Sequence, residues 1–149
     1  MAMITGGCQC GAVRYRISGP LFGAHICHCR MCQKAFGNFF AALVGVKKTD
    51  ITWPRLQPAV FRSSSVSSRG FCPQCGTPLS FAYDHSDHMS VSIGSLDQPD
   101  LARPENQFGM EGILPGFATL HTLPGSRTED DVSPDDMKKL KSFQHPDHE

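Results

Sequence analysis

The chain has 149 residues, with 14 basic and 14 acidic side chains, so its formal net charge is zero and gives no strong attraction for nucleic acid or anionic lipid. The length fits one domain, and 14 glycines, 11 prolines and 10 phenylalanines exclude an all-helical bundle and favour strands. The longest apolar stretch, residues 39–46, is far shorter than the roughly 20 residues of a membrane span. We expect a cytoplasmic protein without a signal peptide or membrane anchor.

Short strands separated by turns are predicted along most of the chain. Residues 12–17 alternate three apolar side chains with Arg14 and Arg16, which predicts a half-buried strand whose arginines face solvent. Residues 30–36 predict one or two helical turns that end at Gly37. His85 and His88 are expected at a hairpin tip. Further strands are expected over residues 39–46, 51–53, 60–67, 79–83 and 89–93.

The C-terminal residues are more polar and are expected to form an extension, residues 126–149, with a short helix. Ser133, Pro134 and the two acids that follow are typical of a helix start, and the helix is predicted to reach Phe143. Beyond it we expect fraying, with His145 and His148 in a solvated terminus.

Seven cysteines are the most informative feature of the sequence. An odd number excludes complete pairing in disulfides, and their short spacings favour a metal. Cys72 and Cys75 form a knuckle closed by Gly76, whose positive φ turns backbone amides toward the sulfurs. Cys8 and Cys10 would share one face of an extended strand. Together these four thiols predict a closed, structural zinc site.

The remaining cysteines, Cys27, Cys29 and Cys32, could bind one ion by themselves. Three protein ligands and one open position are typical of catalytic zinc. His25 shares a strand face with Cys27 and Cys29, so a closed site of three cysteines and one histidine is an alternative that the spacing leaves open.

Three blocks, residues 6–11, 27–34 and 69–79, resemble in order and spacing the glutathione-dependent formaldehyde-activating enzyme family, also called the centromere protein V type domain. Over residues 3–125 the resemblance implies a single zinc-binding domain of the mainly β, Mss4-like (β-tent) fold, with coiled antiparallel sheets around two Zn²⁺ ions and short helices. It implies structural zinc ligands at Cys8, Cys10, Cys72 and Cys75, and catalytic ligands at Cys27, Cys29 and Cys32.

The family's named activity is the condensation of formaldehyde with glutathione to S-(hydroxymethyl)glutathione, which is classed with the carbon-sulfur lyases. The resemblance thus implies a small-molecule thiol and a carbonyl compound as substrates. In the last third the family often carries two tryptophans, whereas this chain has Phe108 and Phe117 in the corresponding segments.

The charge of the three-cysteine site favours the same chemistry. Three thiolates and Zn²⁺ sum to one negative charge, which makes water activation for hydrolysis less natural than activation of a substrate thiol. Such a thiolate could attack an aldehyde carbon. His28 and Lys34 are candidates for the proton donor.

A second hypothesis is a non-catalytic binding module in which both zinc ions are structural. Its partner would be a protein or a nucleic acid. We expect a solvated surface rather than a nucleic-acid patch at the basic residues Lys47, Lys48, Arg62 and Arg69, so nucleic acid is not the expected partner.

Overall fold

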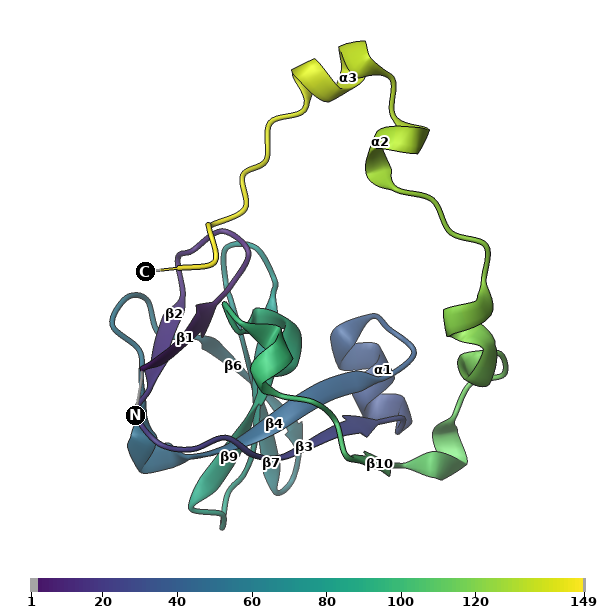
Figure 1. Cartoon of the computed structure of the whole chain (residues 1–149). Helices are drawn as coiled ribbons and strands as arrows, with labels where there is room; N and C mark the ends of the chain where they lie inside the picture. Colours follow the sequence, from purple (N-terminus) through teal and green to yellow (C-terminus); the bar gives the residue numbers. More distant parts are fainter. Residues whose placement is uncertain (1–2, 149) are drawn as a thin grey trace.

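The computed structural model describes residues 3–148 as two β-sheets with short helices (Figure 1). The strands are β1 (Ile4–Gly7), β2 (Arg14–Ile17), β3 (Phe22–Cys27), β4 (Ala41–Lys47), β5 (Ile51–Thr52), β6 (Ala59–Ser64), β7 (Ser67–Phe71), β8 (Pro78–Tyr83), β9 (His88–Ser92) and β10 (Asn106–Phe108). The α-helices are α1 (Arg30–Phe36), α2 (Thr128–Asp131) and α3 (Pro134–Lys139).

The two sheets enclose one main core. The small sheet has the order β1-β2-β5 and the large sheet has the order β10-β3-β4-β9-β8-β7-β6. All pairs are antiparallel except that of β10 with β3. Apolar side chains from both sheets bury one another, including Val13, Tyr15, Ile17, Val44, Val46, Leu79 and Val91. This burial is the main driving force that holds the sheets together.

One expected strand is a hairpin. Residues 60–67 were predicted as a single strand, but β6 ends at Ser64 and β7 begins at Ser67. The Ser64 hydroxyl accepts a hydrogen bond from the Val66 N–H at 3.2 Å and lies 2.7 Å from the Ser67 hydroxyl. Serine side chains thus satisfy the turn's polar groups locally, which competes with continued strand pairing.

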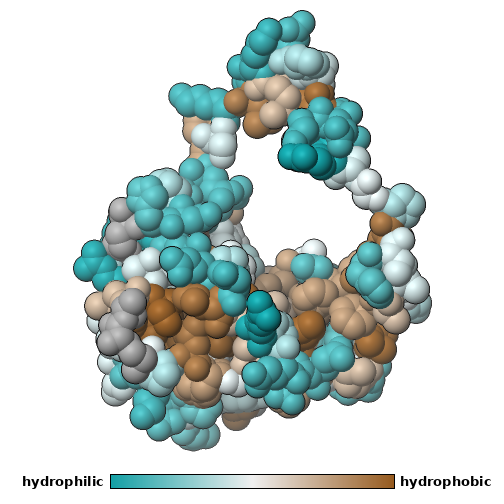
Figure 2. Space-filling model, in the orientation of Figure 1, coloured by the Kyte–Doolittle hydropathy of each residue, from teal (hydrophilic) through white to brown (hydrophobic). Residues whose placement is uncertain are grey.

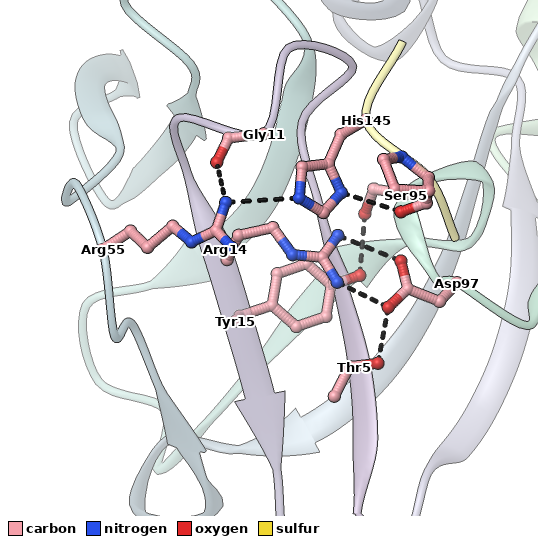
Figure 3. Close-up of polar contacts among 9 residues, drawn as sticks. Thr5, Gly11, Arg14, Tyr15, Arg55, Ser95, Asp97 and His145 are labelled. Carbon is pink, nitrogen blue, oxygen red and sulfur yellow. Dashed lines mark hydrogen bonds and ion pairs between the residues drawn. The ribbon is translucent and has the colours of Figure 1, made fainter. Parts of the chain in front are cut away.

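The arginine expected to face solvent at the start of β2 is buried instead. Arg14 is 2% exposed and donates to both Asp97 carboxylate oxygens, one of them at 3.0 Å (Figure 3). Thr5 donates to the same carboxylate. The Tyr15 hydroxyl lies 2.8 Å from the Ser95 hydroxyl, so the segment around residue 95 covers this face of the small sheet. The alternation of apolar and basic residues therefore predicted the strand, but it could not show which segment covers the strand's second face.

The C-terminal segment forms an arm that leaves the body and returns to it near β2 (Figure 1). In Figure 2 most of this arm is hydrophilic. The Ser133 side chain caps α3 as expected, by accepting from the Asp136 N–H at 3.1 Å, but the helix ends at Lys139 rather than at Phe143. The solvated position expected for His145 was wrong, because its N–H donates to the Gln9 carbonyl at 2.7 Å, whereas residues 140–144 are exposed.

Candidate metal centres and the adjoining cavity

The four cysteines predicted to form a closed site lie together. Their sulfur atoms are all within 4.8 Å of one another, with 3.6 Å between Cys8 and Cys10 and 3.8 Å between Cys10 and Cys72. A tetrahedral ion with Zn–S bonds of about 2.3 Å requires sulfur atoms about 3.8 Å apart. All four thiols, including Cys75, are free of disulfides. Their separations therefore fit a tetrahedral metal site.

A turn, and not an extended strand, brings Cys8 and Cys10 to the same side. The Gly11 N–H donates to the Cys8 carbonyl at 3.0 Å, and the Val13 N–H donates to the Cys8 sulfur at 3.2 Å. The expected strand geometry was wrong because the strand pairing of β1 ends at Gly7. The turn thus satisfies the Cys8 carbonyl and offers a backbone N–H to the Cys8 sulfur.

The second half of this site is the expected knuckle. Gly76 has the predicted positive φ, +79°, and its N–H donates to the Cys72 carbonyl at 2.9 Å. Burial raises the pKa of the Cys75 thiol, but hydrogen bonding with Thr77 and Cys10 outweighs burial and lowers that pKa to about 6. This cysteine is therefore prepared to act as a thiolate ligand near neutral pH.

The other three cysteines form a separate cluster at the junction of β3 and α1. The sulfurs of Cys27, Cys29 and Cys32 lie within 4.8 Å of one another. Cys27 ends β3, whereas the Cys29 sulfur caps α1 by accepting from the Cys32 N–H at 3.4 Å. Among residues 3–148 no histidine belongs to this cluster, and Nδ1 of His25 lies 2.8 Å from the Gly23 carbonyl oxygen.

The environment of this cluster shifts the pKa values of its thiols in different directions. Burial raises the pKa of Cys27 to about 12. Burial by itself would also raise the pKa of Cys29. Hydrogen bonds from the Cys32 backbone and with the neighbouring thiols outweigh burial, so the pKa of Cys29 is lowered overall. A full set of thiolates at this place therefore needs a cation to balance it.

A cavity of about 650 Å³ adjoins the three-cysteine cluster. This volume falls within the range of about 300 to 1,000 Å³ that is usual for small-molecule sites. Its walls combine the three cysteines with apolar side chains and a few polar groups, among them His25, Leu43, Arg69, Phe81, Met89 and Phe108. The cluster is thus open to a ligand of limited size on one side.

The two candidate proton donors, His28 and Lys34, are absent from the described residues that line this cavity. His28 is fully buried, its Nε2 lies 2.9 Å from Oε1 of Gln107, and its ring packs on Phe117 at a centroid distance of 4.6 Å. His28 follows Cys27 directly at the end of β3, so its side chain leaves on the opposite face, whereas Lys34 is exposed on α1, where residues two apart do not share a face.

Arg69 is the residue of the cavity that sequence reasoning missed. It was expected in a solvated basic surface, but it lies on β7 with only 8% of its surface exposed. Its Nη2 donates to the Cys32 sulfur at 3.4 Å, and its guanidinium carbon lies 4.9 Å from the centre of the Phe81 ring. Its position at the start of the 69–79 block was the available signal that it belongs with the cysteines.

A loop after β10 supports the cluster from outside. β10 runs parallel to β3 and sets Phe108 opposite Cys27. Gly109 follows with φ of +63°, and a Cβ at this position would lie 2.6 Å from the Cys29 nitrogen. Only glycine allows both this conformation and this close approach without strain.

The geometry agrees with the similarity of the chain to known proteins. A model of the glutathione-dependent formaldehyde-activating enzyme family matches residues 3–111, which include all seven cysteines. The chain belongs to this family. The mainly β, Mss4-like fold expected from the resemblance is thereby confirmed.

Two curated relatives carry related names. A Halomonas elongata protein, provisionally named a glutathione-dependent formaldehyde-activating enzyme, is 26% identical over 110 residues, which cover 68% of this chain and 70% of that protein. An uncharacterized lyase of Schizosaccharomyces pombe is 32% identical over 85 residues, which cover 56% of this chain and 60% of the yeast protein.

A solved structure shares the fold. A crystal structure of a Rhodobacter sphaeroides protein superposes with a TM-score of 0.55 at 20% identity, and the match covers 69% of this chain and 98% of that one. No helix between residues 3 and 148 combines the length and the apolar character of a membrane span.

Proposed function

We propose that this protein is a zinc-dependent carbon-sulfur lyase-type enzyme that adds a thiol to formaldehyde or another small carbonyl compound. Glutathione is the first candidate for the thiol, as in the named activity of the family. The observation that carries the proposal is the three-cysteine cluster at the wall of a cavity of about 650 Å³.

Two zinc ions per chain are proposed, one in each cysteine cluster. Cys8, Cys10, Cys72 and Cys75 would hold a structural ion, because four thiols leave no position for a substrate. Cys27, Cys29 and Cys32 would hold the catalytic ion, whose charge lowers the pKa of a bound substrate thiol so that a nucleophile exists near neutral pH.

The cavity supports this chemistry through its shape and its walls. Leu43, Phe81, Met89 and Phe108 are apolar, so the carbonyl compound would enter a partly desolvated space beside the thiols. The addition forms one C–S bond and turns the carbonyl group into a hydroxyl group. The proton lost by the thiol ends on that oxygen, so no oxidant and no water is consumed. The seven free thiols fit a reducing compartment, and we place the reaction in the cytoplasm.

A metal count and a thiol titration test the proposal. Protein purified without chelator should contain two zinc ions per chain by native mass spectrometry, because the seven thiols divide into two ligand sets. In cobalt-substituted protein, glutathione should increase the sulfur-to-cobalt charge-transfer absorption, and S-methylglutathione, which has no free thiol, should not. Product formation is followed by NMR with ¹³C-labelled formaldehyde.

Variants of the cluster identify the responding site. Cys27→Ala should abolish the glutathione response and retain the cobalt of the four-cysteine site. His25→Ala serves as the control for a histidine that completes the cluster. If the wild-type protein gives no response while His25→Ala responds, the site is closed, the enzyme proposal fails, and the binding-module hypothesis replaces it.

A further inference from the structure

The guanidinium of Arg69 is held in a fixed orientation beside the three-cysteine cluster. Its Nε donates to the Ser63 hydroxyl at 2.9 Å, and its Nη2 donates to the Cys32 sulfur at 3.4 Å. The guanidinium carbon also lies over the Phe81 ring, 4.9 Å from its centre, a contact that limits rotation further. Three different contacts therefore fix the direction of the remaining nitrogen, Nη1.

Nη1 of Arg69 has no hydrogen-bond partner among residues 3–148 and is itself buried. With 8% of its surface exposed, the side chain is more than nine-tenths removed from solvent. Buried donors are almost always satisfied in folded proteins, because an unpaired one loses its hydrogen bonds to water without a replacement. An unsatisfied donor on a residue that lines the cavity indicates a partner that arrives with a ligand.

The charge around the cavity indicates which kind of partner this is. Arg69 is the one permanently charged residue among the described residues that line the cavity, and none of these is an aspartate or a glutamate. The Cys32 sulfur is the partner of Nη2, so it leaves Nη1 free for another acceptor. A small ligand with a negatively charged oxygen would satisfy Nη1 and the charge together.

We propose that Nη1 of Arg69 forms an oxyanion subsite that donates to the carbonyl oxygen of the substrate. This inference rests on the proposed function. As the sulfur of the thiol forms its bond to the carbonyl carbon, the electron pair of the C=O π bond moves to the oxygen. Nη1 donates a hydrogen bond to that oxygen and keeps its own proton. The oxygen then takes up the proton that the thiol released, which completes the hydroxyl group.

Formate is a suitable probe, because it has one carbon, like formaldehyde, and carries its charge on oxygen. Isothermal titration calorimetry of the zinc-loaded protein with sodium formate should show binding in the wild type. Arg69→Met should weaken formate binding by about tenfold or more, since it removes a charge-assisted hydrogen bond. The matched control is Arg62→Met, in which an exposed arginine of the adjacent strand β6 is lost and formate binding should not change.

Arg69→Lys keeps the inference testable if Arg69→Met does not fold. Lysine retains the charge but cannot contact Cys32 and a ligand with separate nitrogens. This variant should keep two zinc ions and an unchanged glutathione response. Its formate affinity should fall about tenfold, and its kcat with formaldehyde should fall about 100-fold, as for the loss of one oxyanion donor.

Two results would overturn the role of Arg69. One is wild-type formate affinity in a folded, zinc-loaded Arg69→Lys protein, and the other is loss of zinc from the three-cysteine cluster in that variant, which would make Arg69 a counter-charge for the ligands alone. Failure of the proposed function would give a different result. The wild-type protein would then show no response to glutathione, while Arg69→Met would still weaken formate binding.

Discussion

The carboxylate of Asp97 is the clearest case in which a single residue joins distant parts of this protein. Burial by itself would raise its pKa, but hydrogen bonds from Arg14 and Thr5 outweigh burial and hold that pKa below its usual range (Figure 3). Both members of the Arg14–Asp97 pair are buried, with 2% and 7% of their side chains exposed. Removal of one partner would leave an uncompensated buried charge.

Asp97→Asn should therefore reduce the free energy of unfolding by about 3 kcal/mol near neutral pH. Because the folded-state pKa of Asp97 lies below the unfolded value of about 3.9, this stabilisation is present above that value and is lost as the pH falls through the folded pKa. The difference between the wild type and the variant should thus shrink in acid.

Urea unfolding at neutral pH and below about pH 4 checks this expectation. Asp84→Asn is the matched control, since Asp84 pairs with Arg62 on the exposed surface and should matter little. A difference between wild type and Asp97→Asn that is the same at both pH values would contradict the role assigned to the Asp97 charge.

At the scale of elements, the loop that follows β10 controls the three-cysteine cluster without supplying a ligand. Gln33 on α1 donates through Nε2 to the His28 carbonyl at 2.8 Å and to the Gly112 carbonyl at 2.7 Å. Gly109 packs directly on the Cys29 backbone. The loop, the turn before α1 and the end of β3 therefore behave as one packed unit.

Gly109→Ala should disturb this unit. The new Cβ would lie 2.6 Å from the Cys29 nitrogen, and alanine disfavours φ of +63° by about 1 to 2 kcal/mol. We expect the metal affinity of the three-cysteine cluster to fall about tenfold or more, while the four-cysteine site keeps its metal. Competition with a chromogenic chelator measures both sites.

Gly125→Ala is the matched control for this substitution. A Cβ at Gly125 would meet no atom within 4 Å, so chelator competition should give the wild-type curve. Equal metal affinities in Gly109→Ala and Gly125→Ala would show that the contact with Cys29 is not needed to hold the cluster.

At the scale of the whole molecule, the two cysteine clusters differ in what they connect. The four-cysteine set joins the turn after β1 to the turn between β7 and β8, which are far apart in the chain. The three-cysteine set lies within residues 27–32. Only the first set can tie the two sheets together.

Cys72→Ala should therefore lose most folded protein, because a structural zinc ion contributes folding free energy on the order of 10 kcal/mol. Cys32→Ala should keep the fold and lose one metal ion. Thermal melts followed by circular dichroism, together with metal counts, compare the two variants.

A variant of the exposed Cys75 distinguishes the effect of losing the metal ion from the effect of losing core packing. Cys72 is fully buried, whereas Cys75 belongs to the same set but lies at the surface, so Cys75→Ala should lower stability without opening a core cavity. Equal damage in Cys72→Ala and Cys32→Ala would mean that the division into structural and catalytic sites is wrong.

The arm beyond the family match adds a long-range contact of another kind. The family match ends at residue 111, and the boundary expected between residues 125 and 126 stays a prediction. Nε2 of His145 lies 3.2 Å from Nη1 of Arg55, which also donates to the Gly11 carbonyl at 2.9 Å (Figure 3). The end of the arm thus packs beside the turn that presents Cys8 and Cys10.

The sequence by itself determined the features that depend on near neighbours. The spacing of Cys72, Cys75 and Gly76 predicted the knuckle, and the helix over residues 30–36 has the expected bounds and ends at Gly37 with its positive φ. Such features depend on the reach of a few residues and on which residue types tolerate a given backbone conformation. The three cysteine-bearing blocks likewise carried the resemblance to the family, and the resemblance implied the mainly β, Mss4-like fold.

Only the tertiary structure decided which polar side chains are buried and what they meet. Arg14 and Arg69 were both expected in solvent, and each is covered by segments far away in the sequence. The same holds for His28, which lies close to Cys27 in sequence but points away from the cavity, toward Gln107. Burial is the sum of contacts from every element that packs on a residue, and local patterns contain no record of those distant partners.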